Sequence, residues 1–220
     1  MISTVLFDLD GTLINSWNLY IESYRLTVQP YVRKQLTEED IERIKPSSEL
    51  KFIELVIPEK ERAHAFKRFI THYSSLYESM MGKIYDGVHE MLEQLWEQEQ
   101  KVGIVTGKSK EGWEITKRKS NFGKFDVVVT GNDVNNYKPY PEGIIKAINK
   151  LDVNKEEVLY VGDSLVDQQT AIAAGVNHAA SLWSKSKDEI EEFKKQIKEN
   201  GTEIFLEKPM DIFKIPDLKQ

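Results

Sequence analysis

Five short apolar runs recur along the chain, and each ends at or near a polar residue or a glycine. They cover residues 4–7, 102–105, 125–129, 158–161 and 178–182. The runs are apolar at nearly every position rather than at alternate positions, which is typical of strands buried on both faces of a parallel sheet. Helical periodicity alternates with these runs from about residue 84 onward, so the sequence predicts an α/β fold with a doubly wound parallel sheet.

The segments between the later runs carry helix signals. Residues 88–96 and 144–151 each place apolar side chains on one helical stripe, and Pro141 suits the first turn of the second helix. Ser186 begins a capping box, and Gly201 can end the helix that follows it. These segments are predicted to cover the sheet.

A long stretch without any strand signal, residues 14–81, separates the first run from the second. Thr37 begins a pattern typical of a helix cap, and apolar side chains over residues 66–80 predict a long amphipathic helix that ends near Gly82. The first crossover of the sheet is therefore predicted to contain a helical insertion.

This arrangement predicts two domains. The core would consist of residues 1–14 and 83–220, and the helical cap of residues 15–82. Of the 220 residues 40% are hydrophobic, which is enough to bury roughly 70% of the unfolded surface without disulfides or a structural metal. An insertion at this place can act as a lid over one edge of the sheet.

Charge and cysteine content exclude several classes of function. The chain has 30 Lys and Arg against 36 Asp and Glu, a net charge of −6, which argues against a nucleic acid partner. It has no cysteine, so disulfides, thiolate zinc sites, iron–sulfur clusters and cysteine nucleophiles are excluded. Since neither a signal peptide nor a run of about 18 apolar residues is present, we expect a cytoplasmic protein with no membrane partner.

Two carboxylates follow the first predicted strand. Asp8 and Asp10 lie at the carboxyl end of the run at 4–7, where an open α/β sheet forms its ligand crevice. Side chains two positions apart in extended backbone face the same side, so the pair can share a hard cation or divide nucleophilic and acid–base work. For this motif in isolation, a solvated turn is the alternative.

Another acidic pair closes the run at 158–161. Asp163 lies at the predicted strand end, and Asp167 falls in the first turn of the next helix, where a negative charge also suits the helix dipole. Taken alone, Asp167 is more typical of a helix start than of a metal ligand. Together the two acidic pairs supply four carboxylates and no His or Cys, which is the ligand set expected for Mg²⁺ rather than zinc.

Two further segments can meet a phosphate at the same edge of the sheet. Thr106 and Gly107 follow the run at 102–105 and precede a helix, so a hydroxyl and free backbone N–H groups would face the crevice. Lys138 lies in a proline-rich stretch just before another helix. A lone lysine is usually only a surface charge, and neither segment is specific without the others.

Together and in this order, the motifs resemble the haloacid dehalogenase superfamily. The resemblance rests on Asp-Leu-Asp-Gly-Thr at 8–12, Thr106, Lys-Pro at 138–139 and Gly-Asp-Ser-Leu-Val-Asp at 162–167, and it spans essentially the whole chain. The insertion after the first motif is similar to the helical cap of the subfamily that contains phosphoglycolate phosphatase, a pyrophosphatase and β-phosphoglucomutase. The resemblance implies a Rossmann-like core beneath that cap.

The resemblance also implies a role for each motif residue. Asp8 would be the nucleophile that forms an aspartyl-phosphate, and Asp10 would be the general acid and base. Thr106 and Gly107 would donate hydrogen bonds to the phosphoryl oxygens, while Lys138 would offset their negative charge.

A Mg²⁺ ion is implied in the same way. The Asp8 carboxylate, the Asp10 backbone carbonyl and Asp163 would hold it, and Asp167 would either bind it through water or orient Lys138. Four carboxylates beside a dianionic phosphate need a divalent cation and a lysine for charge balance.

Details within the motifs favour a phosphatase that acts on a small phosphorylated metabolite, as phosphoglycolate phosphatase does. Asp-Gly-Thr at 10–12 is the phosphotransfer form of the first motif, which disfavours dehalogenases and phosphonate-cleaving relatives. The stretch 44–49 lacks the Arg of the β-phosphoglucomutase loop and only partly matches the loop of related phosphatases. In that stretch Lys45 is a candidate substrate-binding residue or a solvated charge. The sequence leaves the oligomeric state open between a monomer and a homodimer.

Residues outside the motifs are interpreted as structural. Trp17, Tyr20 and Tyr24 are spaced like one helix face and are expected to form the core of the cap. The four histidines show no spacing typical of a metal site.

Several alternatives remain at this point. A pyrophosphatase or a β-phosphoglucomutase-like phosphotransferase would use the same motifs. A phosphoryl-receiver module shares the strand-end aspartates, the lysine and Mg²⁺, but its acidic pair and its acceptor lie on different strands and it has no helical insertion. A non-catalytic, regulatory protein that binds a phosphate ligand is the remaining alternative, because a fold alone does not establish a function.

Overall fold

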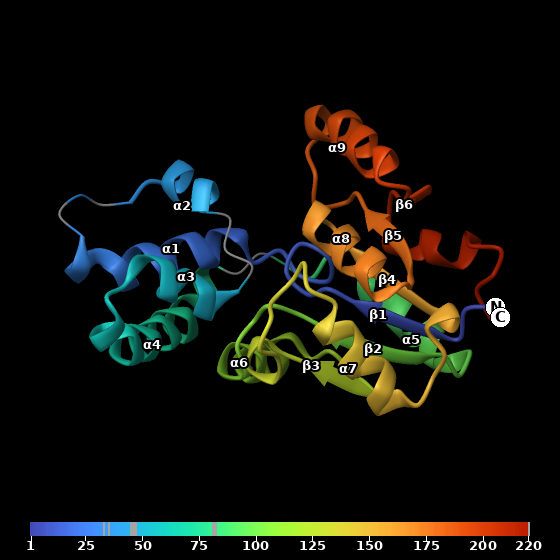
Figure 1. Ribbon diagram of the computed structural model, residues 1–220, viewed down its shortest axis with the longest axis horizontal. Coiled ribbons are helices and arrows are strands. Elements are labelled where there is room, and N and C mark those ends of the chain that lie inside the picture. Colours follow the sequence, from blue (N-terminus) through green and yellow to red (C-terminus); the bar gives the residue numbers. More distant parts are fainter. Residues whose placement is uncertain (33, 35, 45–47, 81–82, 220) are drawn as a thin grey trace.

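The computed structural model describes residues 1–32, 34, 36–44, 48–80 and 83–219. Six parallel strands form one sheet in the order β3-β2-β1-β4-β5-β6 (Figure 1). They are β1 (Thr4–Phe7), β2 (Lys101–Val105), β3 (Val127–Val129), β4 (Val158–Gly162), β5 (Asn177–Ser181) and β6 (Ile204–Leu206). The predicted α/β fold with a parallel sheet is confirmed.

Helices cover both faces of the sheet. One face carries α5 (Val88–Glu97), α6 (Lys110–Ser120) and the 3-10 segment Pro209–Lys214, and the other carries α7 (Glu142–Leu151) and α8 (Leu165–Ala174), with α9 (Lys187–Glu199) packed beside β5. In β1, Phe7 contributes to the first core and Leu6 to the second. Both faces of the sheet are buried beneath helices, which is why the strands are apolar at nearly every position.

The insertion forms a helical bundle with its own core, which we call the cap. It contains α1 (Trp17–Val28), α2 (Glu38–Ile44), α3 (Glu49–Val56) and α4 (Arg62–Met80). Aromatic rings fill its centre: Tyr20, Tyr24, Phe52, Phe69 and Tyr73. Figure 1 shows these helices beside the carboxyl ends of the central strands, so the cap is placed to cover that edge.

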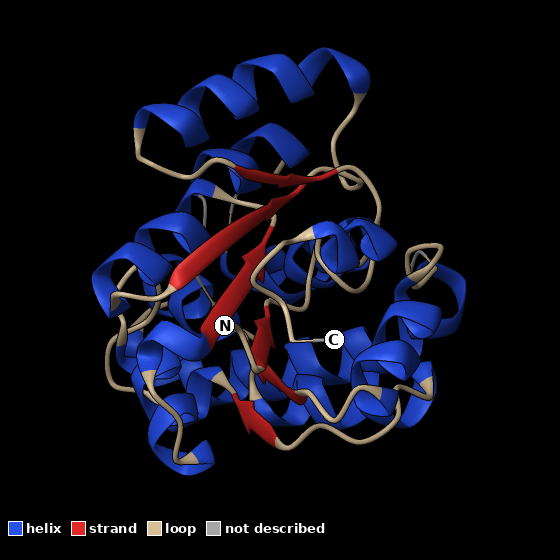
Figure 2. Cartoon of the chain, turned by 90° about the vertical axis from the view of Figure 1, so that its right-hand side faces the viewer, coloured by secondary structure: helices blue, strands red, loops and turns tan. Residues whose placement is uncertain are grey.

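The two connections between cap and core run side by side. Ile14 and Ile84 form an isolated antiparallel bridge, and the Asn15 N–H donates to the Lys83 carbonyl over 3.2 Å. The domain boundaries at residues 14/15 and 82/83 remain our prediction. At the far end of the sheet, Ile2 pairs with Leu218, which brings the first and last described segments together, on the side that faces the viewer in Figure 2.

The structure differs from the sequence prediction at the sheet edges. β6 was not expected, because a three-residue edge strand with only Leu206 buried carries too short a pattern. The run at 125–129 yields a strand only from Val127, since the Asp126 carboxylate instead accepts from the Val102 N–H at 2.8 Å. The capping box at Ser186 is confirmed.

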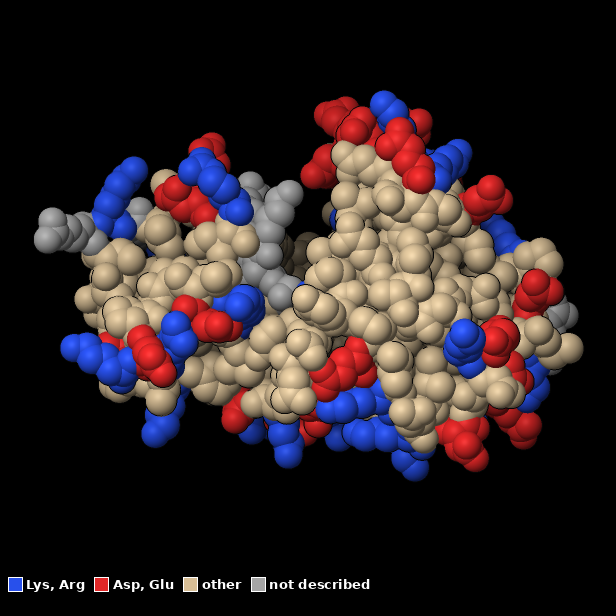
Figure 3. All heavy atoms as spheres, viewed as in Figure 1, with Lys and Arg blue, Asp and Glu red and all other residues tan. Residues whose placement is uncertain are grey.

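Surface charges of both signs are interspersed over the face shown in Figure 3, on the cap as well as on the core. Within the described ranges, every helix is too short or too polar to cross a membrane. The charges that matter for chemistry are buried, at the junction of the two domains.

Candidate active site

The sheet order brings the predicted motif residues to one edge. β1 lies between β2 and β4, so the residues that follow these three strands share the crevice at their carboxyl ends. Asp8 directly follows β1, and its N–H donates to the Val161 carbonyl at 2.9 Å, which extends the ladder by one residue. Its side chain is thereby held at the sheet edge.

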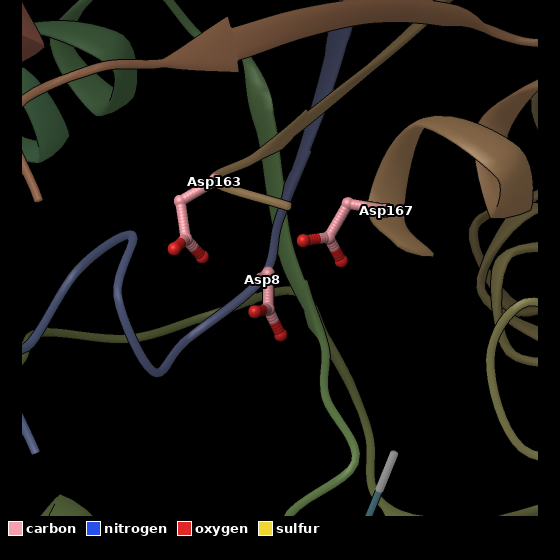
Figure 4. A group of neighbouring side chains, drawn as sticks. All are labelled: Asp8, Asp163 and Asp167. Carbon is pink, nitrogen blue, oxygen red and sulfur yellow. The ribbon is translucent and has the colours of Figure 1, made fainter. Parts of the chain in front are cut away.

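Three carboxylates converge there. Asp8, Asp163 and Asp167 each offer an oxygen, and these oxygens all lie within 4.8 Å of one another. Asp163 follows β4, and Asp167 comes from the first turn of α8, where a capping box with Ser164 holds it. Figure 4 shows the three carboxylates facing a common space. These three aspartates together with Lys138 are called the sheet-edge cluster below.

Lys138 is the cation of this cluster. Its Nζ lies 2.8 Å from Asp8 Oδ1 and 2.7 Å from Asp167 Oδ1, and it also donates to the Tyr160 hydroxyl at 3.2 Å. Asp167 is fully buried, and its second oxygen accepts from Ser164. Asp167 therefore orients Lys138, which is one of the two roles that the sequence left open for it.

Burial and mutual repulsion shift the ionisation of the carboxylates. Burial raises the pKa of Asp8 to about 8 against the opposing effect of Lys138, and the charges of Asp167 and Asp163 add to the rise. Burial also raises the pKa of Asp163. The pKa of Asp167 is lowered, since Lys138 and Ser164 outweigh its burial. Lys138 and Lys185, which is described below, are two lysines beside three carboxylates, so the cluster still lacks one positive charge.

The donor set fits Mg²⁺. All donors are carboxylate oxygens, which hard divalent cations prefer. The turn after Asp10 brings backbone against this group: Gly11 has φ +86°, and a Cβ there would lie 2.5 Å from Asp163 Oδ2. Only glycine lets the backbone after Asp10 approach the Asp163 carboxylate this closely.

A second lysine, Lys185, was not predicted. It follows β5 and lies 3.0 Å from Asp163 Oδ2. Its ring contact with Phe193, 4.9 Å from Nζ to the ring centroid, holds it near the site. Nothing in the local sequence around Lys185 distinguishes it from an exposed loop lysine.

The predicted phosphate-binding segment lies at the same edge. Thr106 and Gly107 follow β2 and line one small cavity together with Lys138. The Thr106 N–H donates to the Val129 carbonyl at 3.0 Å, so this amide is not free for a phosphate. The Thr106 hydroxyl accepts from the Lys108 N–H at 3.1 Å and keeps its own proton for a ligand.

The Asp10 side chain points away from the other three aspartates, toward the cap. Its Oδ1 accepts from the Ser16 hydroxyl at 2.5 Å and lies 3.1 Å from Lys108 Nζ, and its Oδ2 lies 3.3 Å from the Tyr20 hydroxyl. The two carboxylates of the first motif are therefore separated: Asp8 lies at the sheet edge, and Asp10 faces the cap.

Sequence reasoning missed the partners of Asp10. Lys108 directly follows the predicted phosphate segment and was given no role, and Glu49 was only part of a loop comparison. Tyr20 was expected in the cap core, where its ring does lie, but its hydroxyl contacts Asp10. The candidate substrate residue Lys45 lies outside the described residues.

Comparisons with known proteins agree with these motifs. A family model described as haloacid dehalogenase-like hydrolase matches residues 5–181. The pyrophosphatase PpaX of Bacillus thuringiensis (strain Al Hakam) is 38% identical over 193 residues, covering 83% of this chain and 84% of the relative. PpaX of Bacillus cereus (strain B4264) is 39% identical over 187 residues, with the same coverage.

Solved structures share the fold. A Lactobacillus plantarum protein assigned as a phosphoglycolate phosphatase superposes with a TM-score of 0.80 at 26% identity, covering 97% of this chain and 99% of that one. CbbY of Rhodobacter sphaeroides, in complex with phosphate, superposes with a TM-score of 0.82 at 20% identity and covers 96% of each chain.

Proposed function

The chain belongs to the haloacid dehalogenase-like hydrolase family and is a phosphatase of that family, and we propose that it is a Mg²⁺-dependent enzyme that works through an aspartyl-phosphate. The proposed substrate is a small phosphomonoester of the phosphoglycolate kind. The observation that carries the proposal is the division of the first motif: Asp8 lies at the sheet edge with the acidic cluster, and Asp10 faces the cap.

In the first step, an Asp8 carboxylate oxygen would attack phosphorus in line with the leaving oxygen. The new oxygen–phosphorus bond forms as the bond to the leaving group breaks, and Asp10 gives its proton to the departing oxygen. Lys138, which contacts both Asp8 and Asp167, is placed to offset the charge of the transferred group. The Thr106 hydroxyl would donate to a phosphoryl oxygen.

In the second step, Asp10 would take a proton from water as the water oxygen attacks phosphorus. The bond to Asp8 breaks, orthophosphate leaves and the free carboxylate is restored, so atoms and protons balance over the cycle. The Asp8 carboxylate, the Asp10 backbone carbonyl and Asp163 would hold Mg²⁺, which would supply positive charge to the phosphoryl oxygens, while Asp167 orients Lys138. Positioning and charge stabilisation supply most of the rate, because the protein offers little other covalent chemistry.

Pyrophosphate is a second candidate substrate. It is favoured by the 38–39% identity to Bacillus proteins named pyrophosphatase PpaX. The same residues would act, with orthophosphate as the leaving group in place of an alcohol.

Phosphate release from phosphoglycolate, sugar phosphates, p-nitrophenyl phosphate and pyrophosphate tests the proposal, with Mg²⁺ and with chelator. We expect Mg²⁺-dependent release that Asp8→Asn abolishes, because no neighbouring group can replace the nucleophile. Release that continues in folded Asp8→Asn, or that persists in chelator, would contradict the mechanism. The substrate with the highest kcat/KM identifies the class.

A further inference from the structure

A lysine with no exposed side-chain surface lies where the cap meets the core. Lys108 comes from the loop between β2 and α6, and its Nζ donates to the Tyr73 hydroxyl at 2.8 Å, to the Tyr20 hydroxyl, and lies 3.1 Å from Asp10 Oδ1. Its three N–H groups thus have three acceptors. Both tyrosines belong to the cap, whereas Lys108 and Asp10 belong to the core.

Glu49 completes this group from the cap side. It is the first residue of α3, is 1% exposed, and lies 3.8 Å from Lys108 Nζ. One of its oxygens lies 2.7 Å from the Tyr20 hydroxyl, and the other accepts from the N–H and the hydroxyl of Ser109. Ser109 is the N-cap of α6, so a cap carboxylate binds the positive end of a core helix. Asp10, Lys108, Glu49, Tyr20 and Tyr73 are called the seam cluster below.

A glycine makes room for this contact. A Cβ at Gly112, within α6, would lie 2.7 Å from Glu49 Oε1 and 3.0 Å from Lys108 Cγ. Glycine inside a helix costs roughly 0.5–1 kcal/mol relative to alanine. Gly112 therefore leaves space on α6 for the Glu49 carboxylate, and this evidence for the contact is independent of the charges.

The seam cluster holds one lysine between two carboxylates. Burial lowers the pKa of Lys108, but Asp10, Tyr73 and Glu49 together raise it above its ordinary value, so the side chain stays protonated. A buried ammonium is stable only while its partners remain, because an uncompensated buried charge is strongly destabilising. The seated cap therefore supplies part of what keeps Lys108 in place.

We propose that Lys108 and Glu49 are positioning residues that hold Asp10 in its proton-transfer geometry only while the cap lies against the core. The inference rests on the proposed function, in which Asp10 is the acid and base. Lys108 acts through Asp10 rather than on substrate, since it has no exposed surface.

Cap movement would remove most of the support for Asp10. Tyr20 would leave with α1, and Lys108 would lose Tyr20, Tyr73 and Glu49 as partners. Ser16, at the start of the connection, would remain beside Asp10. Proton delivery would then be confined to the closed state, in which water is excluded from the reacting groups.

The first experiment measures Lys108→Met by its dependence on the leaving group. Phosphoglycolate and sugar phosphates need a proton on the departing alkoxide oxygen, whereas p-nitrophenyl phosphate releases a stable anion without one. Single turnovers with enzyme in excess report release of the leaving group, which is the first step alone. We expect the rate of this step to fall by about 10²-fold with the proton-requiring substrates and by no more than about threefold with p-nitrophenyl phosphate, as general acid catalysis is worth roughly 10²–10⁴. Asp10→Asn should give the same pattern in the first step, while hydrolysis of the aspartyl-phosphate, which needs Asp10 as base, should slow with every substrate.

Two further variants keep Lys108 and decide the question if Lys108→Met does not fold. Glu49→Gln removes the carboxylate charge, and Gly112→Ala adds a methyl group that pushes Glu49 away without any change of charge. Both should lower the first-step rate with the proton-requiring substrates by about tenfold, with little change in KM, which is less than the roughly 10²–10⁴ of general acid catalysis because Lys108 remains beside Asp10. The matched control is Glu54→Gln, on the same helix but in an exposed pair with Lys51, and it should match wild type.

Equal losses of the first-step rate on both kinds of substrate would overturn the inference, since a residue that acts through Asp10 cannot slow release of a leaving group that needs no proton. Unchanged kcat in folded Lys108→Met would overturn it too. These outcomes are separate from failure of the proposed function, which would appear as an inactive wild type or an active Asp8→Asn.

Discussion

The sheet-edge cluster and the seam cluster lie on opposite sides of the first motif and are built in different ways. Asp8, Asp163, Asp167 and Lys138 all come from the core, and each is fixed by a strand end or a helix start. The seam cluster takes Asp10 and Lys108 from the core but Glu49 and two tyrosines from the cap. The first cluster therefore exists whatever the cap does, and the second exists only when the two domains meet.

Each cluster holds one carboxylate more than it holds lysines. At the sheet edge, three carboxylates lie beside Lys138 and Lys185, and the pKa of Asp8 is raised to about 8 by burial. At the seam, one lysine faces two carboxylates, and its three N–H groups all have acceptors. In the proposed mechanism Mg²⁺ would complete the first cluster, whereas residues of the cap complete the second. Binding of the phosphoryl group and transfer of the proton would then depend on different parts of the molecule.

Removing the sheet-edge lysine should have the largest effect. Lys138→Met leaves Asp8 and Asp167 without their shared cation, and we expect kcat to fall by about 10³-fold, roughly 4 kcal/mol. The loss should be the same with p-nitrophenyl phosphate and with phosphoglycolate, in contrast to the seam variants. Lys146→Met, on α7 in an exposed pair with Glu142, is the control and should keep wild-type kcat. A loss of kcat with phosphoglycolate but not with p-nitrophenyl phosphate would show that Lys138 acts on proton transfer, as the seam residues are expected to, and would contradict the distinction between the two clusters.

Acid should weaken the sheet through one buried histidine. Burial lowers the pKa of His178 on β5 to about 4, so between pH 6.5 and 4 the unfolded chain binds a proton that the folded one does not. The stabilisation is complete above pH 6.5 and is lost as pH falls toward 4, by about 3 kcal/mol. Urea unfolding across this range should show a smaller loss in His178→Asn. An equal loss in both proteins would assign the acid sensitivity to other groups.

Mg²⁺ should stabilise the folded protein through the sheet-edge cluster and not through the seam cluster. A ligand at 100 times its Kd stabilises the folded state by about 2.7 kcal/mol, which thermal unfolding detects as a rise in Tm. We expect this rise in wild type and in Lys108→Met, because the seam is not part of the cation site, and its loss in Asp163→Asn. A rise that is absent from Lys108→Met would show that the two clusters are coupled.

The smallest effect is expected from one hydroxyl at the seam. Tyr20→Phe keeps the aromatic packing of the cap but removes the group between Asp10, Lys108 and Glu49, and we expect kcat with phosphoglycolate to fall about fivefold, roughly 1 kcal/mol. Tyr24→Phe, in the same aromatic stack, should be near wild type. If both variants behave alike, the Tyr20 hydroxyl has no specific role.

Sequence patterns predicted the two clusters to very different extents. Asp8, Asp163 and Asp167 follow strands or begin a helix, so the rule that ligands bind at the carboxyl ends of parallel strands found them, whereas Lys138 was found through the family resemblance. The sequences around Lys108 and Glu49 are typical of exposed charged residues. Their contact depends on how the cap packs against α6, and a local sequence pattern cannot predict such packing. Gly112, a glycine inside a helix, is the local feature that is consistent with this contact.

The paired connections at Ile14 and Ile84 limit how the cap can move. Because both strands of the link leave the core at one place and are bonded to each other, the cap can rotate about that line, but it cannot slide along the sheet without breaking the bridge. Rotation about this link would return every cap residue to the same partner. Glu49 would therefore meet the same end of α6 after an opening, and the accuracy of the seam would depend on the two bridged connections rather than on the seam's own contacts.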